Sequence, residues 1–246
     1  MDESEHASRA ASFGGVAEVY DATRPDYPLE AVRWMVGLPP ATVVDAGAGT
    51  GKLTRVLVAA GYDVIAVEPS EAMLDRLRSA SPGVTAVQGS GEALLLSDAS
   101  ADAVTYGQAW HWVDPALASA EAARVLRPGG ALGLVWNLRR TDDPVGTALA
   151  ELLGDDDTTS PAPWDIAGLN VGGEFGRPKR ATFPHAQTLT RDGLLGLVRS
   201  RSYVIVMPED VRAPLLARVG ALHDDLAVDG TVTVTYETTA YRARRL

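Results

Sequence analysis

The chain contains no cysteine and no long uninterrupted apolar run. Without cysteine it can form no disulfide, no thiolate metal site and no cysteine nucleophile. No stretch approaches the roughly eighteen consecutive apolar residues of a membrane-spanning helix, so we expect no membrane span. The first residues, Met-Asp-Glu-Ser-Glu-His, are acidic and lack the apolar segment of a secretory signal. We therefore expect a cytoplasmic protein.

Basic charge is scarce as well. The 246 residues include 22 Lys and Arg against 32 Asp and Glu, which gives a net charge of −10 without any basic tract. Because affinity for nucleic acid depends on neutralising phosphates with Lys and Arg, we expect no nucleic-acid partner. The His, Asp and Glu residues show no ligand spacing, so we also expect no metal. Apolar residues make up 46% of the chain, which is enough to bury a full core.

The most informative stretch is the glycine-rich run at residues 43–51, Val-Val-Asp-Ala-Gly-Ala-Gly-Thr-Gly. An apolar run that breaks into three alternating glycines predicts a buried strand turning sharply into a helix, with bare backbone at the turn. A second apolar run, at 63–67, ends in Glu68, whose carboxylate can accept hydrogen bonds from both hydroxyls of a ribose. Together they predict the nucleoside-binding half of a doubly wound α/β fold.

The spacing of the glycines discriminates between nucleoside ligands. Dinucleotide binders carry G-x-G-x-x-G, whereas this run reads G-x-G-x-G and has Lys52 in place of the third dinucleotide glycine. A Walker A loop is excluded because Ala46 and Leu53 stand where it needs Gly and Ser or Thr. A glycine turn preceded by Asp45 suits a small zwitterion better than a pyrophosphate, since the carboxylate and backbone carbonyls can face an ammonium group.

Five motifs, in order along the chain, carry a resemblance to a known family. They are residues 44–54, 67–74, 88–94, 106–112 and 124–130, which read VDAGAGTGKLT, VEPSEAML, QGSGEAL, YGQAWHW and RVLRPGG. With these motifs the chain resembles the class I S-adenosylmethionine-dependent methyltransferases, in the methyltransferase type 11 or trans-aconitate methyltransferase-like branch. The resemblance spans most of the first 140 residues and thins beyond Asn137.

The resemblance implies S-adenosylmethionine as cofactor and S-adenosylhomocysteine as its product. The residues that it places around the methionine portion, the ribose and the adenine are Asp45, Ala46, Gly47, Gly49, Glu68, Pro69, Met73, Ser90, Gly91, Glu92 and Gln108. Many relatives carry an aspartate where Ser90 stands, and its carboxylate accepts the amino hydrogens of adenine. A serine hydroxyl makes that contact weaker or absent, so we expect backbone groups of 90–92 to bind adenine instead. For Glu92 the alternative is an acid in the first turn of a helix.

The segment before the glycine run resembles the family's Tyr…Arg-Pro-x-Tyr-Pro element through Tyr20, Arg24 and Tyr27. The resemblance leads us to expect that this segment folds over the cofactor. Arg24 would then face the methionine carboxylate in a directional ion pair, and a tyrosine would close the pocket. The alternative is an ordinary helix connection bounded by prolines.

The Gln-Ala-Trp-His-Trp motif follows a predicted strand, at the sheet edge where ligands of open α/β folds bind. His111 is the candidate general base, because imidazole titrates near neutral pH. The alternative is a histidine that only shapes the site, since methyl transfer needs little beyond in-line placement of the acceptor. The residues expected to line the acceptor are Tyr20, Trp110, Trp136, Asn137 and Tyr203.

Apolar periodicity and turn residues predict alternating strands and helices. The expected strands are 42–46, 63–67, 84–88, 103–107, 131–136, 182–189 and 231–241. The expected helices are 16–22, 28–36, the segment from the glycine run to Gly61, one capped by Ser70, one from Asp114 to the glycines at 129–130, and an amphipathic helix over 211–226. We expect a loop at 154–163.

Alternating strands and helices imply a parallel sheet with right-handed crossovers. The family resemblance adds that the fold is Rossmann-like and doubly wound. It implies a mostly parallel seven-stranded sheet with an antiparallel last strand and a helical substrate cap. We expect residues 1–40 to form an N-terminal helical segment covering the active site and 41–137 to form the S-adenosylmethionine-binding core. Residues 138–246 would supply the substrate cap and the C-terminal strands of the same domain.

The sequence thus predicts a methyltransferase that acts on a small-molecule acceptor, for example a specialised metabolite, by direct SN2 displacement. It would be a monomer or a homodimer. One alternative is a non-catalytic S-adenosylmethionine-binding protein. A less favoured one is an NAD-dependent oxidoreductase, which would need the missing third glycine. High alanine content and an excess of Arg over Lys hint at a bacterial source with a high-GC genome.

Overall fold

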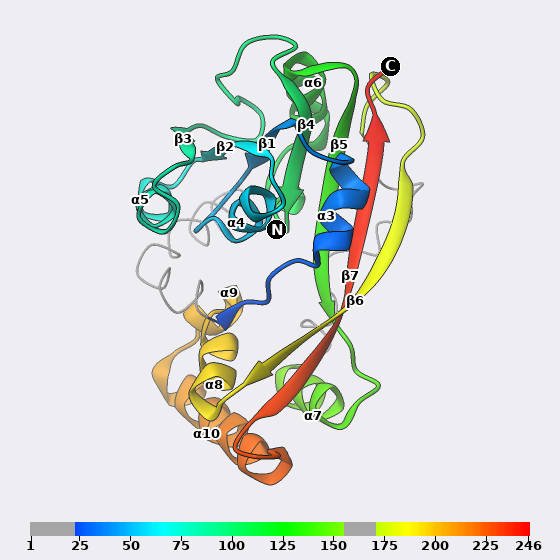
Figure 1. Ribbon diagram of the computed structural model, residues 1–246. Helices are drawn as coiled ribbons and strands as arrows, with labels where there is room; N and C mark the ends of the chain where they lie inside the picture. Colours follow the sequence, from blue (N-terminus) through cyan, green and yellow to red (C-terminus); the bar gives the residue numbers. More distant parts are fainter. Residues whose placement is uncertain (1–22, 155–170) are drawn as a thin grey trace. The chain divides into compact units, whose positions relative to one another are not determined.

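The computed structural model describes residues 23–154 and 171–246 (Figure 1). Tyr20 and the helix predicted at 16–22 lie outside these ranges, as does the loop predicted at 154–163 after its first residue. The described residues fall into two units. The core unit contains 26–137, 171–183 and 238–246, and the second unit contains 23–25, 138–154 and 184–237.

One seven-stranded sheet has the order β3-β2-β1-β4-β5-β7-β6. Its strands are β1 (Thr42–Ala46), β2 (Asp63–Glu68), β3 (Thr85–Gln88), β4 (Ala101–Gly107), β5 (Leu126–Arg139), β6 (Lys179–Leu189) and β7 (Val232–Arg244). Strands β1 to β5 are parallel to one another. Strand β7 runs antiparallel to β5, since the Gly129 N–H donates to the Arg245 carbonyl and the Arg140 N–H to the Thr235 carbonyl. The predicted mixed sheet with an antiparallel last strand is confirmed.

The helices of the core unit alternate with its parallel strands, as expected for right-handed crossovers. They are α3 (Leu29–Val36), α4 (Lys52–Ala59), α5 (Glu71–Ala80), α6 (Pro115–Val125) and the short 3₁₀ helix η2 (Trp110–Trp112). The second unit contains α7 (Pro144–Leu153), α8 (Arg191–Arg199), α9 (Ser202–Ile205) and α10 (Glu209–Leu226). The amphipathic helix predicted over 211–226 is therefore confirmed and begins two residues earlier.

Two predicted helix caps have opposite outcomes. The Asp114 carboxylate accepts hydrogen bonds from the Ala116 and Leu117 N–H groups, at 2.8 and 3.1 Å, and Pro115 occupies the first helical position. The predicted N-cap of α6 is thus confirmed. The cap by Ser70 is wrong, because among the described residues the Ser70 side chain makes no capping bond. Its backbone N–H instead donates to the carboxylate of Glu68 over 2.9 Å.

Strand β5 begins earlier than the sequence predicted. The Pro-Gly-Gly at 128–130 was expected to separate a helix from a strand, but α6 ends at Val125 and β5 already starts at Leu126. The extra residues fit into β5 because its register with β4 shifts: Ala101 pairs with Leu126, but Ala103 pairs with Ala131. A bulge of this kind accommodates a proline, which has no N–H for the ladder.

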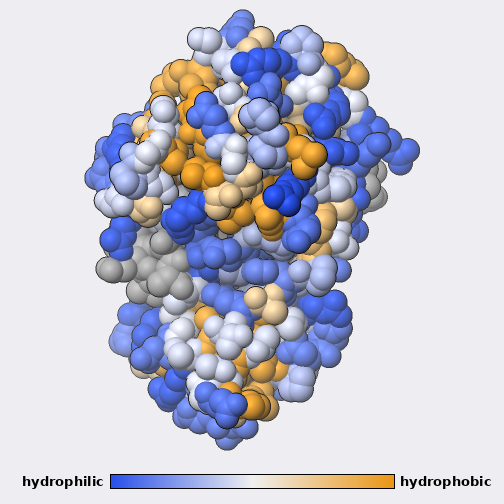
Figure 2. Space-filling view, in the orientation of Figure 1, coloured by the Kyte–Doolittle hydropathy of each residue, from blue (hydrophilic) through white to orange (hydrophobic). Residues whose placement is uncertain are grey.

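Each unit has its own apolar core. In the core unit the buried cluster includes Val32, Met35, Leu57, Ala103 and Ala240. In the second unit it includes Leu149, Leu194, Val219, Val234 and Tyr236. Figure 2 shows apolar groups in separate patches among hydrophilic ones on the visible face. Within the described ranges, no helix is long and apolar enough to cross a membrane.

Candidate functional site

The glycine run forms the sharp turn between β1 and α4 that the sequence predicted. Gly47, Gly49 and Gly51 have φ of +65°, +57° and +87°, in the left-handed region that favours glycine. The Gly47 N–H donates to the Val67 carbonyl over 2.9 Å, which ties the turn to β2. A Cβ added at Gly47 would lie 2.7 Å from the Cβ of Ala109. The backbone is therefore bare at this turn because both conformation and space require it.

Glu68 ends β2 and holds the glycine turn directly. One carboxylate oxygen accepts from the Gly49 N–H at 2.8 Å, and the other accepts from the Ser70 N–H at 2.9 Å. Only 7% of Glu68 is exposed, and burial raises the pKa of its carboxyl while the two N–H groups oppose that shift. Each carboxylate oxygen has a second lone pair, so the group can still accept from ribose hydroxyls. The sequence did not reveal this link between the acid and the turn.

Asp45 is the last residue but one of β1, just before the glycine turn, and only 1% of it is exposed. Its Oδ2 accepts from the Thr54 hydroxyl at 2.6 Å, whereas its Oδ1 is buried and has no hydrogen-bond partner among the described residues. Burial, aided by the nearby Glu68 charge, raises the pKa of Asp45 to about 7. A buried oxygen without a donor is costly, so this position fits a ligand that brings an N–H or ammonium group.

The loop after β3, residues 89–93, lies beside the end of β2. The Gly89 N–H donates to the Glu68 carbonyl over 3.3 Å, and Ser90 forms a short antiparallel bridge with Ala93. The carboxylate of Glu92 accepts from the Asp114 N–H at 2.9 Å. No helix follows Glu92 within the described segment 91–99, so the alternative of a first-turn helix acid is wrong.

Three further expected cofactor residues are Met73, Pro69 and Gln108. The sulfur of Met73, on α5, lies 3.8 Å from the position that a Cβ on Gly49 would take. The Pro69 carbonyl accepts from the Gln88 side-chain amide at 3.3 Å, which joins the ends of β2 and β3. Gln108, just after β4, has φ of +52°, and its N–H donates to the Val135 carbonyl over 2.8 Å. A side chain in that left-handed region costs backbone energy, a kind of strain often found at ligand sites.

The Trp-His-Trp motif forms η2, immediately after β4. Trp110 is fully buried and its ring lies edge-on to Tyr106, with centroids 4.9 Å apart. The His111 ring lies 4.8 Å from the Trp112 ring, which is 39% exposed. The structure thus places Trp110 in the core and His111 beside a surface tryptophan. The expected roles of His111 as general base and Trp110 as an acceptor contact stay predictions.

The end of β5 anchors the segment that precedes α3. The Asn137 side-chain amide donates to the Asp26 carbonyl at 3.0 Å, and its oxygen accepts from the Thr238 hydroxyl at 2.6 Å. Lys52 pairs with the Asp26 carboxylate at 3.1 Å. The hydroxyl of Tyr27 lies 3.0 Å from the Cβ position of Gly107. Residues 26–27 therefore lie at the carboxyl edge of the core-unit sheet, beside the residues that the sequence predicts to bind the cofactor.

The remaining predicted residues have other environments. Trp136 is buried with its ring edge-on to Tyr241, at a centroid distance of 5.9 Å. In the second unit the Arg24 guanidinium donates to the Ser200 carbonyl at 3.1 Å. Tyr203 packs against the apolar cluster of that unit. The cofactor contact of Arg24 and the acceptor contacts of Trp136, Asn137 and Tyr203 stay predictions.

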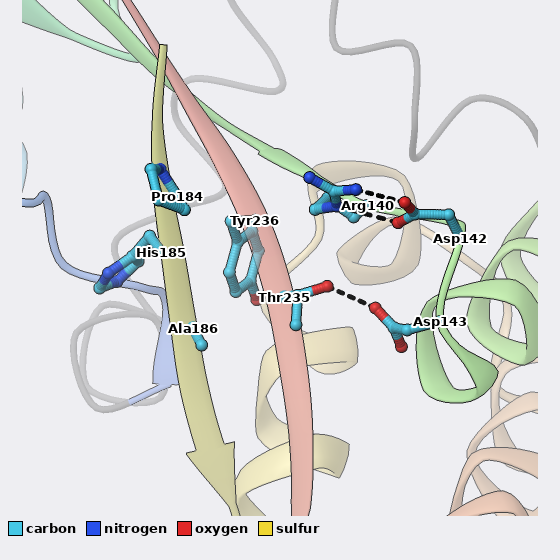
Figure 3. Close-up of a pocket in the computed structure, with 8 residues that line it drawn as sticks. All are labelled: Arg140, Asp142, Asp143, Pro184, His185, Ala186, Thr235 and Tyr236. Carbon is cyan, nitrogen blue, oxygen red and sulfur yellow. Dashed lines mark hydrogen bonds and ion pairs between the residues drawn. The ribbon is translucent and has the colours of Figure 1, made fainter.

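A pocket of about 500 Å³ lies in the second unit (Figure 3). It is lined by Arg140, Asp142, Asp143, Pro184, His185, Ala186, Thr235 and Tyr236. Its Arg140, Asp142 and Asp143 side chains already have protein partners: Arg140 pairs with Asp142, and Asp143 accepts from the Gly146 N–H and the Thr235 hydroxyl. The glycine turn therefore remains the candidate site. Within the described residues no cluster of His, Asp and Glu is arranged to hold a metal.

The similarity of this chain to known proteins covers more of the sequence than the five motifs do. A family model described as a methyltransferase domain matches residues 44–134. The uncharacterized methyltransferase Rv3342 of Mycobacterium tuberculosis is 44% identical over 243 residues, covering 94% of this chain and 95% of that protein. The uncharacterized methyltransferase-like C25B8.10 of Schizosaccharomyces pombe is 33% identical over 236 residues, with 92% of each chain covered.

A solved structure shows the same fold. It is that of a candidate type II methyltransferase from Anaeromyxobacter dehalogenans, with a TM-score of 0.68 and 26% identity, and it covers 90% of this chain and 97% of that one. The matched range 44–134 contains the glycine turn, Glu68, the loop after β3 and η2. The comparisons and the geometry therefore select the same part of the molecule.

Proposed function

Because the chain belongs to the class I S-adenosylmethionine-dependent methyltransferases, we propose that it transfers a methyl group from S-adenosylmethionine to a small-molecule acceptor by direct displacement. The observation that carries the proposal is the arrangement at the end of β1 and β2. There a bare glycine turn lies between the Glu68 carboxylate and a buried Asp45 oxygen that has no donor within the described ranges. This arrangement offers an acceptor for an ammonium group on one side of the turn and acceptors for a diol on the other.

The residues fit the cofactor in its three parts. Asp45 and the backbone of 46–49 would hold the methionine portion, and Glu68 would hold the ribose. The adenine would lie by Met73 and the 90–92 backbone, with Pro69 and Gln108 at the edges. Residues 26–27, anchored to Asn137, would close the carboxyl edge of the sheet. No phosphate cradle is needed, which agrees with Lys52 in place of the third dinucleotide glycine.

When bound, the cofactor supplies a methyl group on a positively charged sulfur, which a nucleophilic acceptor atom can displace. The protein has to align the acceptor with that carbon and exclude water. His111, just after β4, would take up the proton that the acceptor loses, since a neutral imidazole has a nitrogen that can accept one. Trp110, Trp136, Asn137 and Tyr203 are the proposed acceptor contacts.

A small-molecule acceptor suits the charge of the chain. With 32 acidic and 22 basic residues, the protein has little to attract a nucleic acid. The direct test is to incubate the protein with S-adenosylmethionine and a panel of small hydroxyl, amine, carboxyl and thiol compounds, and to measure S-adenosylhomocysteine formation. We expect acceptor-dependent product from the native chain and at least about tenfold less from Glu68→Gln. Tight cofactor binding without any product across a broad panel would instead favour a non-catalytic binding protein.

A further inference from the structure

The loop after β3 (residues 89–93, the β3 loop) is fixed by several bonds. The Ser90 N–H donates to the Ala93 carbonyl at 3.2 Å, and the Ala93 N–H returns to the Ser90 carbonyl at 3.1 Å. Downstream, the Leu94 N–H donates to the Glu121 carboxylate at 2.8 Å. The loop also starts directly beside Glu68, through the bond from the Gly89 N–H. A base attached to a ribose held by Glu68 would therefore meet this backbone.

One buried side chain of the neighbouring strand holds the middle of the loop. The Tyr106 hydroxyl, on β4, donates to the Gly91 carbonyl at 2.9 Å. Tyr106 is fully buried, and its ring is supported edge-on by Trp110. Burial raises the pKa of the Tyr106 hydroxyl, so it keeps its proton and stays a donor at neutral pH. The sequence motifs gave no reason to select this tyrosine.

The loop also touches the tyrosine ring and its surroundings. A Cβ added at Gly91 would lie 2.7 Å from Cγ1 of Val113 and 2.9 Å from Cε1 of Tyr106. Only glycine allows the backbone to come this close. The position of the Gly91 peptide is thus set by a hydrogen bond and by direct contact with the same ring.

We propose that Tyr106 is a positioning residue for the base of the cofactor, because its hydroxyl fixes the Gly91 peptide and thereby the backbone groups that face the adenine. This inference rests on the proposed function, since it takes the β3 loop as the adenine site. A rigid backbone matters here because the loop offers few side-chain groups for the base. Ser90 has only a hydroxyl, and the Glu92 carboxylate is engaged by the Asp114 N–H.

The test is Tyr106→Phe, which removes the hydroxyl and keeps the ring. We expect the dissociation constant for S-adenosylhomocysteine, measured by calorimetry, to rise about 5- to 10-fold, the factor typical of one lost hydrogen bond. The matched control is Tyr62→Phe. The hydroxyl of Tyr62 also donates to a glycine carbonyl, that of Gly37, and its ring is also buried in the core unit. That control should change the affinity by less than about twofold.

A specificity measurement separates positioning from a general loss of structure. S-inosylhomocysteine carries a 6-oxo group and an N1–H donor where S-adenosylhomocysteine has the 6-amino group and an N1 acceptor. If Tyr106 sets the groups that face the base, Tyr106→Phe should lower the preference for the adenine ligand. An unchanged affinity for S-adenosylhomocysteine, or equal losses for both ligands, would overturn the inference.

A second variant changes Gly91 itself and tests the same contact if Tyr106→Phe does not fold. Gly91→Ala should push the loop off the Tyr106 ring and weaken S-adenosylhomocysteine binding. Its control, Gly83→Ala, adds a Cβ in the turn before β3 with nothing within 4 Å. Equal binding by Gly91→Ala and Gly83→Ala would contradict the inference. If the native chain itself fails to bind S-adenosylhomocysteine, the proposed function fails with it, whereas native binding with unaffected variants removes only the role of Tyr106.

Discussion

At the scale of single residues, two carboxyl groups of different character flank the glycine turn. Glu68 is satisfied by two backbone N–H groups, which hold it ready to accept from a diol. Asp45 is fully enclosed and has one oxygen that lacks a donor among the described residues. Glu68 is thus a preformed hydrogen-bond acceptor. The buried Asp45 oxygen destabilises the protein as long as no donor reaches it. A ligand with both groups would satisfy both residues, its ammonium group donating to Asp45 and its ribose hydroxyls to Glu68.

The Asp45 environment makes a prediction about stability and pH. Its pKa is raised from 3.8 to about 7, so the folded state favours the protonated carboxyl. Its contribution to the free energy of unfolding is therefore unaffected below about pH 4 and falls as the pH rises from 4 to 7. Asp45→Asn removes this dependence. The free energy of unfolding of the variant, relative to that of the native chain, should therefore rise by on the order of 4 kcal/mol between pH 4 and pH 8.

The measurement for Asp45 is urea unfolding of the native chain and Asp45→Asn at several pH values without cofactor. Groups distant from Asp45 titrate alike in both proteins, so the difference between the two curves reports Asp45 together with its coupling to Glu68. A difference that stays constant from pH 4 to pH 8 would mean that Asp45 is not held neutral by burial.

At the scale of elements, the sequence predicted the strands and helices that build the site, because each depends on a local pattern. The apolar run 43–46, the glycines after it and Glu68 predict a strand, a turn and a strand end without reference to distant residues. The bond between Glu68 and the Gly49 N–H, and that between Tyr106 and Gly91, could not be predicted in this way. They depend on register between neighbouring strands, which local patterns do not specify.

The errors have the same origin. Ser70 has the residue type of an N-cap, but the Glu68 carboxylate takes its N–H and the serine side chain makes no cap among the described residues. The Pro-Gly-Gly at 128–130 has the composition of a helix stop, yet Gly129 and Gly130 form backbone hydrogen bonds with Arg245, just after β7, and the segment belongs to β5. In both places the local residue type does not decide which hydrogen bonds form.

The glycine turn makes a prediction at this scale. Gly47→Ala should weaken S-adenosylhomocysteine binding by at least about tenfold, because its Cβ would clash with Ala109 at 2.7 Å and displace the turn. Gly129→Ala is the control. Gly129 also has a left-handed φ, +77°, but nothing lies within 4 Å of its added Cβ. Both variants share the backbone strain, so equal cofactor affinities in calorimetry would show that the turn does not contact the ligand.

The caps of α6 and α5 provide a second prediction for elements. Asp114→Ala removes two hydrogen bonds to the first turn of α6 and should cost about 0.5–2 kcal/mol in the free energy of unfolding. Ser70→Ala, at the corresponding position of α5, should cost little, since its side chain makes no cap among the described residues. Denaturant unfolding of the two variants checks this. A loss for Ser70→Ala as large as that for Asp114→Ala would contradict the capping assignment.

At the scale of the whole molecule, each of the two described units has a buried apolar cluster of its own. The glycine turn, Glu68, the β3 loop and η2 all lie in the core unit, and so does the segment 26–27 that Asn137 anchors. The groups proposed for the cofactor are thus mostly contributed by one unit, with Arg24 as the exception. The five family motifs, all before residue 137, lie in this unit.

The central claim is that the glycine turn and Glu68 bind the nucleoside of S-adenosylmethionine. The most direct measurement is calorimetric titration of the native chain with S-adenosylhomocysteine, with Glu68→Gln as the variant and NAD as competitor. We predict micromolar binding by the native chain, a loss of at least about tenfold in the variant, and no competition by NAD. Absence of binding, unchanged affinity in Glu68→Gln, or displacement by NAD would contradict the account.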